Sequence, residues 1–221
     1  MIGSLFVALV TSLVWLSAAH VSAGRRSPPP RRLVLALALW GVAALGVTAL
    51  TPLVSRLTLP IDLAVSPDSA WGGRVLYFSL YVGLVEESAL LIAAVLASTG
   101  DEWQSCAVRG CMYAGATALG FAAVENGRYA DAHGMSLLLV RAVTTSLAHG
   151  LLTTPWGAAL GGVCGSDRST LEKGALIGGA LVVSAVLHGL TDALLYGEQV
   201  PVAVALLTGV ALVVGGLLRR A

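Results

Sequence analysis

Six ionisable side chains lie inside long apolar segments of this sequence. They are Glu86, Glu87, Glu125, His149, His188 and Asp192. A charged group in a hydrocarbon environment costs several kcal/mol unless it is paired, protonated or solvated. Carboxylates and imidazoles are also the side chains that most often act as general acids and bases. Their occurrence in four successive apolar segments therefore predicts one shared polar site, in which they neutralise one another around water.

Both histidines have polar neighbours at helical spacing. His188 and Asp192 are four residues apart in LHGLTD, so they share one face of a helix. A carboxylate beside an imidazole fixes which ring nitrogen carries the proton and raises the basicity of the ring. His149 and Thr153 have the same spacing in AHGLLT, which makes Thr153 a weaker supporting partner.

Glu86 and Glu87 are adjacent in the sequence. Adjacent residues of a helix point about 100° apart, so the two carboxylates cannot have the same direction. We therefore expect one glutamate to face the site directly and the other to reach a neighbouring helix or a supporting partner.

The six residues are compatible with two kinds of hydrolysis. In the first, a glutamate deprotonates a water while His149, His188 or both polarise the substrate carbonyl or stabilise the oxyanion. In the second, Glu125, His149 and His188 hold zinc, with a water in the open position. The sequence has no His-Glu-x-x-His pair, and it leaves the dependence on a metal open.

The segments that must position these residues are hydrophobic and long. Hydrophobic residues make up 57% of the 221-residue chain and charged residues 11%, against about 25% charged residues in soluble domains. Seven apolar runs have about the length that a membrane-spanning helix needs, roughly 20 residues or more. They are about Ile2 to Ala23, Leu33 to Val54, Gly72 to Ser98, Cys106 to Tyr129, Met135 to Val163, Gly174 to Tyr196 and Val200 to Leu218. The pattern predicts an all-α, polytopic bundle of about seven transmembrane helices, embedded in the lipid bilayer.

We expect three regions in this bundle. Residues 1–70 form two N-terminal transmembrane helices and linkers, residues 71–197 form a four-helix catalytic core, and residues 198–221 form a C-terminal transmembrane helix. The net charge of +1, with no continuous basic face, argues against nucleic acid as a partner. We expect His20 and His133 to lie at the interface or surface, and Trp156 to be a packing or interface residue.

The lysines and arginines of the short loops predict the orientation. One set of span ends carries Arg25, Arg26, Arg31, Arg32, Arg109, Arg168, Lys173, Arg219 and Arg220, and the other carries at most Arg56, Arg74, Arg128 and Arg141. The first set is expected in the cytoplasm, which places the N-terminus outside and the C-terminus inside. The polar site then lies in the outer half of the membrane and opens outward, and the three cysteines lie near the cytoplasmic ends, where they stay reduced.

Four local patterns resemble the PrsW family of intramembrane proteases. In order they are EESAL from Glu86, GFAAVEN ending in Glu125 and Asn126, AHGLLT around His149, and LHGLTD around His188. The family is related to the CAAX prenyl endopeptidases and to bacteriocin-protection membrane proteins. The resemblance covers about Leu84 to Asp192 and leaves the first two spans and the last one outside it.

This resemblance implies an endopeptidase of the bacterial plasma membrane. It would cleave a membrane-anchored partner, usually an anti-sigma factor, on the extracytoplasmic side. The residues that it implies for catalysis are Glu86, Glu87, Glu125, His149 and His188, with Asp192 in support and Asn126 as a hydrogen-bond donor to the oxyanion. The sequence departs from the family at Leu90, where the first motif usually has a lysine, and Arg141 or Arg74 is a candidate replacement for that cation.

Two other classes of function compete with a protease. Carboxylate and histidine relays inside a membrane also suit a proton-coupled or cation-coupled transporter. The small size, the missing inverted repeat and the lack of paired broken helices argue against that class. The third class is a non-catalytic membrane scaffold or bacteriocin-protection relative, which Leu90 favours.

Overall fold

The structure is all-helical. The computed structural model describes residues 2–39, 44, 47, 66–99 and 106–220, and no strand occurs in these ranges. Five stretches are long and apolar enough to cross a membrane: Gly3–Arg26, Trp71–Ser98, Ala107–His133, Met135–Val163 and Thr170–Tyr196. A shorter apolar helix covers Val200–Gly216. The predicted all-α fold with several membrane-spanning helices is confirmed at this level.

The bounds of the helices are α1 Ile2–Ala23, η1 Gly24–Arg26, α3 Trp71–Tyr77, η2 Phe78–Gly83, α4 Leu84–Ser98, α5 Ala107–His133, α6 Met135–Leu152, α7 Thr154–Val163, α8 Thr170–Tyr196 and α9 Val200–Arg220. Short connections join the helices from α5 to α9. A further helical stretch covers residues 30–39. The second predicted span, Leu33 to Val54, lies mostly outside the described residues.

Two helices are longer than the sequence predicts. α5 continues four residues beyond Tyr129 and ends at His133, because Gly134 leaves the helix at φ 97°. His133, which the sequence predicts at the interface or surface, is the last residue of this helix and is exposed. α8 begins at Thr170 rather than Gly174, because Ser169 and Glu172 form a capping box that satisfies the first free N–H groups of the helix.

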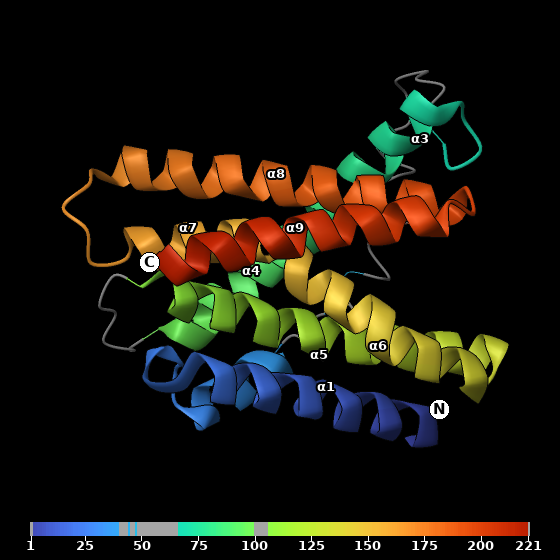
Figure 1. The fold of residues 1–221 in the computed structure, drawn as a ribbon, viewed down its shortest axis with the longest axis horizontal. Helices are drawn as coiled ribbons and strands as arrows, with labels where there is room; N and C mark the ends of the chain where they lie inside the picture. The colour runs from blue at the N-terminus through green and yellow to red at the C-terminus, as the bar shows by residue number, and fades with distance from the viewer. Residues whose placement is uncertain (1, 40–43, 45–46, 48–65, 100–105, 221) are drawn as a thin grey trace.

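α5 is the central helix of the bundle. It packs against α1, α4, α6 and α7, and 72% of its most apolar window is buried, against 22% to 33% in the four other candidate spans. Figure 1 shows the long helices side by side, with α1 at one edge, α8 and α9 at the other, and α5 between them. Glu125 on α5 is thereby brought into the interior of the bundle.

Glycines allow two pairs of helices to approach very closely. A β-carbon on Gly110 of α5 would overlap the backbone of Gly157 and Gly161 of α7. A β-carbon on Gly83 would overlap the carbonyl group of Ala185, and one on Gly189 would overlap Ser79. The second set locks η2 to α8, so the glutamates that follow η2 lie directly beside His188. Such close approaches are how helices associate where lipid removes the hydrophobic drive.

The segment before the glutamates and the fifth predicted span both deviate from an α-helix. η2 is a π-helical stretch between α3 and α4, and π-helical turns often occur at functional sites. The fifth span is divided at Thr153 into α6 and α7, with Pro155 in the first turn of α7, where its missing N–H costs no hydrogen bond. The division lets His149 and Trp156 face different partners.

Candidate active site

A cavity of about 720 Å³ lies among η2, α4, α5, α6 and α8. We call it the central cavity. Five of the six predicted residues line it: Glu86, Glu125, His149, His188 and Asp192. The sixth, Glu87, does not line the cavity, and its side chain is completely buried. The prediction that the two adjacent glutamates point in different directions is therefore confirmed.

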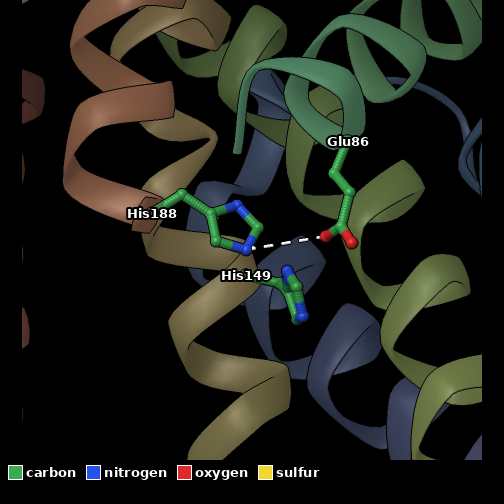
Figure 2. Close-up of side chains that lie close together, drawn as sticks. All are labelled: Glu86, His149 and His188. Carbon is green, nitrogen blue, oxygen red and sulfur yellow. Dashed lines mark ion pairs between the residues drawn. The ribbon is translucent and has the colours of Figure 1, made fainter. Parts of the chain in front are cut away.

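Glu86, His149 and His188 form the centre of the site (Figure 2). One oxygen of Glu86 and one nitrogen of each imidazole all lie within 4.8 Å of one another. His188 Nε2 is 3.5 Å from Glu86 Oε2, and the two imidazole rings are 5.1 Å apart at an angle of 74°. Three helices, α4, α6 and α8, thus each contribute one potential ligand or catalytic group.

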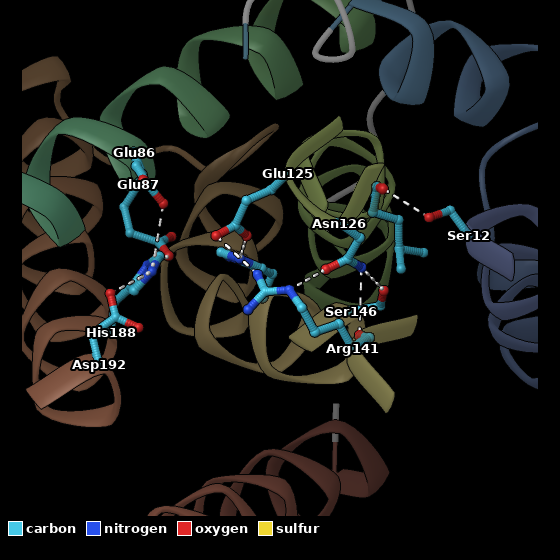
Figure 3. Close-up of polar contacts among 11 residues, drawn as sticks. Ser12, Glu86, Glu87, Glu125, Asn126, Arg141, Ser146, His188 and Asp192 are labelled. Carbon is cyan, nitrogen blue, oxygen red and sulfur yellow. Dashed lines mark hydrogen bonds and ion pairs between the residues drawn. The ribbon is translucent and has the colours of Figure 1, made fainter. Parts of the chain in front are cut away.

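Glu87 holds the other nitrogen of His188. His188 Nδ1 is 2.9 Å from Glu87 Oε1, and Trp156 Nε1 donates to Glu87 Oε2 at 2.7 Å. An ionised carboxylate can only accept hydrogen bonds, so the proton of this contact belongs to His188 Nδ1. His188 Nε2 is therefore the nitrogen that is left for the cavity, between Glu86 and Asp192 (Figure 3).

Glu125 holds His149 in the same manner. His149 Nε2 is 3.0 Å from Glu125 Oε2, and Arg141 lies 3.0 Å from Glu125 Oε1. Phe121 packs edge-on against the ring of His149 at a centroid distance of 5.0 Å. Each histidine thus has one carboxylate partner, and each of those carboxylates has one N–H donor behind it. The donor is a cation for Glu125 and a neutral indole for Glu87.

Asn126 holds Arg141 rather than the cavity. Arg141 Nε donates to Asn126 Oδ1 at 3.0 Å, and Asn126 Nδ2 donates to Ser146 Oγ at 3.2 Å (Figure 3). The guanidinium also lies 3.8 Å from the centre of the Tyr129 ring. The amide of Asn126 is fully engaged and buried, so its place in this structure is that of a support for Arg141, whereas the sequence predicts a donor to an oxyanion.

Asp192 and Thr153, which the sequence predicts as partners of His188 and His149 one helical turn away, differ in what they contact. Asp192 Oδ2 is 3.6 Å from His188 Nε2, and its side chain is 29% exposed to the cavity. Thr153, in contrast, donates its hydroxyl to the carbonyl of Gly150 at 3.1 Å. A backbone carbonyl three residues earlier is a common competing acceptor for threonine, so Thr153 does not contact the His149 ring through its hydroxyl.

The missing lysine has a structural explanation. Leu90 is completely buried in the main apolar cluster, with Ala93 and Ala94 as neighbours in that cluster. Of the two predicted replacements, Arg141 pairs with Glu125, and Arg74 donates to Pro67 and lies over Tyr196. Among the described residues, the imidazole of His188 contacts both Glu86 and Glu87.

Trp156 and His133 belong to the site although the sequence places them outside it. Trp156 has an exposed fraction of zero, and its indole donates to Glu87. Its partner is 69 residues away in the chain, so no local spacing reveals the contact. His133 lines the mouth of the central cavity at the end of α5.

The central group fits a metal ion. Two histidines and one glutamate are a donor set of catalytic zinc sites, in which outer carboxylates hold the imidazoles. Both imidazoles here have such a carboxylate. In addition, His149 Nδ1 is buried without a hydrogen-bond partner among the described residues, and a buried polar atom is rarely left unsatisfied.

Fold and site together define a class: a helical membrane protein with a buried glutamate–histidine centre. Residues 29–216 match the PrsW family of intramembrane metalloproteases, and the chain belongs to this family. It is therefore an integral, multi-pass bacterial membrane protein. The family resemblance seen in the sequence motifs is confirmed. The predicted extent, Leu84 to Asp192, is too short, because the match also covers the second predicted span and most of the last one and leaves only the first span outside it.

A curated relative is Protease PrsW of Bacillus subtilis (strain 168). It is 29% identical over 141 residues, which cover 61% of this chain and 61% of the relative. No solved structure matches the chain.

We predict that Arg141→Met lowers the thermal unfolding midpoint in detergent, because Glu125 then keeps a partly buried charge without its cation. Adding Glu125→Gln to Arg141→Met should recover part of the loss, since it removes that charge. Arg128→Met is the control, because Arg128 also lines the central cavity but is exposed. Equal midpoints for Arg141→Met and Arg128→Met would contradict the assigned pairing.

Proposed function

We propose that this chain is an intramembrane endopeptidase that hydrolyses a peptide bond of a membrane-anchored protein in the central cavity. The observation that carries the proposal is the convergence of Glu86, His149 and His188 on one side of that cavity. Acid, base and imidazole groups within reach of one water are what peptide hydrolysis requires. Residues 71–197 form the catalytic core in this proposal.

The side chains have separate roles in the reaction. Glu86, which is only 16% exposed, faces the cavity and contacts the attacking water. Asp192 is the most exposed of the site carboxylates and accepts or returns a proton at the cavity surface. His149 and His188 stabilise the negative charge that develops on the carbonyl oxygen. Glu87 and Glu125 do not touch substrate and fix the orientation of the two imidazoles.

In the alternative, metal-dependent mechanism, Glu86, His149 and His188 would instead be the ligands of the metal ion, in place of the set Glu125, His149 and His188 that the sequence suggests. When bound, zinc would supply Lewis acidity and a water of lowered pKa. Glu125 is the less suitable ligand, because both of its oxygens already contact Arg141 and His149. Its contact with His149 instead suits a carboxylate that orients a ligand.

We further propose cleavage near the extracytoplasmic face. The central cavity extends to the C-terminal ends of α5 and α8. In Figure 1 these helices end at the side where the chain begins, and the N-terminus and C-terminus lie at opposite ends of the long axis. This arrangement supports an odd number of spans, and with the basic loops in the cytoplasm the N-terminus and the cavity mouth would lie outside. A membrane-anchored anti-sigma factor is the substrate that the family suggests.

We predict that Glu86→Gln abolishes cleavage of the substrate when both are co-expressed. The amide cannot take up a proton from water, and loss of a general base costs on the order of 100-fold or more. The measurement is the amount of shortened product from candidate membrane-anchored anti-sigma factors on immunoblots.

The matched control is Glu172→Gln. Glu172 is exposed at the start of α8, far from the cavity, and glutamine keeps the capping box with Ser169. Equal processing by wild type and Glu86→Gln would end the assignment of this site to proteolysis. If neither the wild type nor any variant cleaves a candidate substrate, another membrane-anchored candidate is tested.

We predict that removal of bound metal stops cleavage by the purified chain and that zinc restores it. The donor set of two histidines and a glutamate matches catalytic zinc sites. Zinc content would be measured together with activity, and His149→Ala should reduce both. Full activity with far less than one zinc per chain would leave the metal-free glutamate mechanism as the correct one.

A further inference from the structure

We propose that Trp156 is a positioning residue of the active site, and that its indole N–H fixes Glu87 so that Glu87 fixes His188. The inference rests on the proposed function, because it concerns the same site. It adds α7, a helix that contributes no residue to the central cavity, to the elements on which catalysis depends.

The Glu87 carboxylate is isolated from solvent. Its side chain is completely buried, and its two oxygens have one donor each, His188 Nδ1 on Oε1 and Trp156 Nε1 on Oε2. Water cannot replace either donor at zero exposure. Without the indole, Oε2 loses its only hydrogen-bond partner among the described residues, and a carboxylate with a single donor can turn about its terminal torsion, which is soft.

The carboxylate of Glu125 is less isolated than that of Glu87. It is 27% exposed and has the guanidinium of Arg141 as well as His149, so water and a cation both limit the effect of losing one donor. Glu87 has neither. The orientation of Glu87, which holds His188 Nδ1, therefore depends on one neutral hydrogen bond, whereas the orientation of Glu125, which holds His149, is secured by an ion pair.

The packing of α7 holds the indole of Trp156 rigidly. Gly157 and Gly161 follow Trp156 on α7 and pack directly on the backbone of α5 near Cys111 and Gly110. Trp156 has an exposed fraction of zero and belongs to the main apolar cluster. Helix packing thus sets the position of Trp156, and its N–H acts as a fixed hydrogen-bond donor. A residue that supports an active-site group must be fixed in this way.

The chain provides a matched control for the experiment. Trp15 on α1 also donates its indole N–H, to the carbonyl of Ala142 at 3.0 Å. Replacing Trp15 by phenylalanine removes the same kind of hydrogen bond from the same kind of side chain, on a helix that carries no residue of the site. Trp15→Phe therefore controls for the loss of an indole hydrogen bond as such, although Trp15 is only partly buried and Trp156 has an exposed fraction of zero.

The experiment compares the two variants in the purified full-length chain. We expect Trp156→Phe to lower kcat by about 10–100-fold, the usual effect of losing a support of a ligand or catalytic group, with KM changed little. Trp15→Phe should keep kcat within about two-fold. If Trp156→Phe does not fold, benzothienylalanine at position 156 serves instead, because it keeps the shape of the indole and lacks only the N–H.

A second readout does not require activity. Histidine-selective ¹⁵N labelling reports the ring nitrogens of the four histidines, with His188 identified by its absence in His188→Asn. Loss of the Trp156 N–H should shift the His188 nitrogens, while Trp15→Phe leaves them in place. Unchanged His188 signals in the Trp156 variant would overturn the proposal. If the shift occurs while Glu86→Gln processes the substrate as the wild type does, the proposed function fails and the positioning role stands.

Discussion

Glu87 has a carboxylate in a place that water does not reach, and the site is built around that constraint. A buried carboxyl group of this kind is stable only with hydrogen-bond partners of good geometry. The structure provides His188 from α8 and Trp156 from α7, which brings three helices to one point. The helix that carries Glu87 also carries Glu86, and the angle between adjacent residues then directs Glu86 into the central cavity.

The same constraint explains the close packing around the site. Gly83 and Gly189 let η2 and α8 approach until their backbones touch, and Gly110 lets α7 approach α5. Larger residues at these positions would separate the carboxylate from its donors by more than a hydrogen bond allows. These glycines are therefore part of the arrangement of the site, because they set the distances between ionisable groups that lie far apart in the chain.

The residue types and order in the sequence were sufficient to predict the helical fold and the members of the polar cluster. Local spacing also predicted that His188 and Asp192 lie together, since four residues make about one helical turn. The partners of Glu87 could not be predicted, because Trp156 and His188 are 69 and 101 residues away. The spacing of His149 and Thr153 was misleading, because Thr153 has a backbone acceptor on its own helix.

The central claim is that Glu86 and His188 belong to one hydrolytic centre. Its most direct test is the cleavage rate in proteoliposomes for Glu86→Gln, His188→Ala and the double variant. Residues that act as a unit are strongly non-additive, so the double variant should be no slower than the slower single variant. Losses that multiply in the double variant, or a single variant with the wild-type rate, would contradict a common centre.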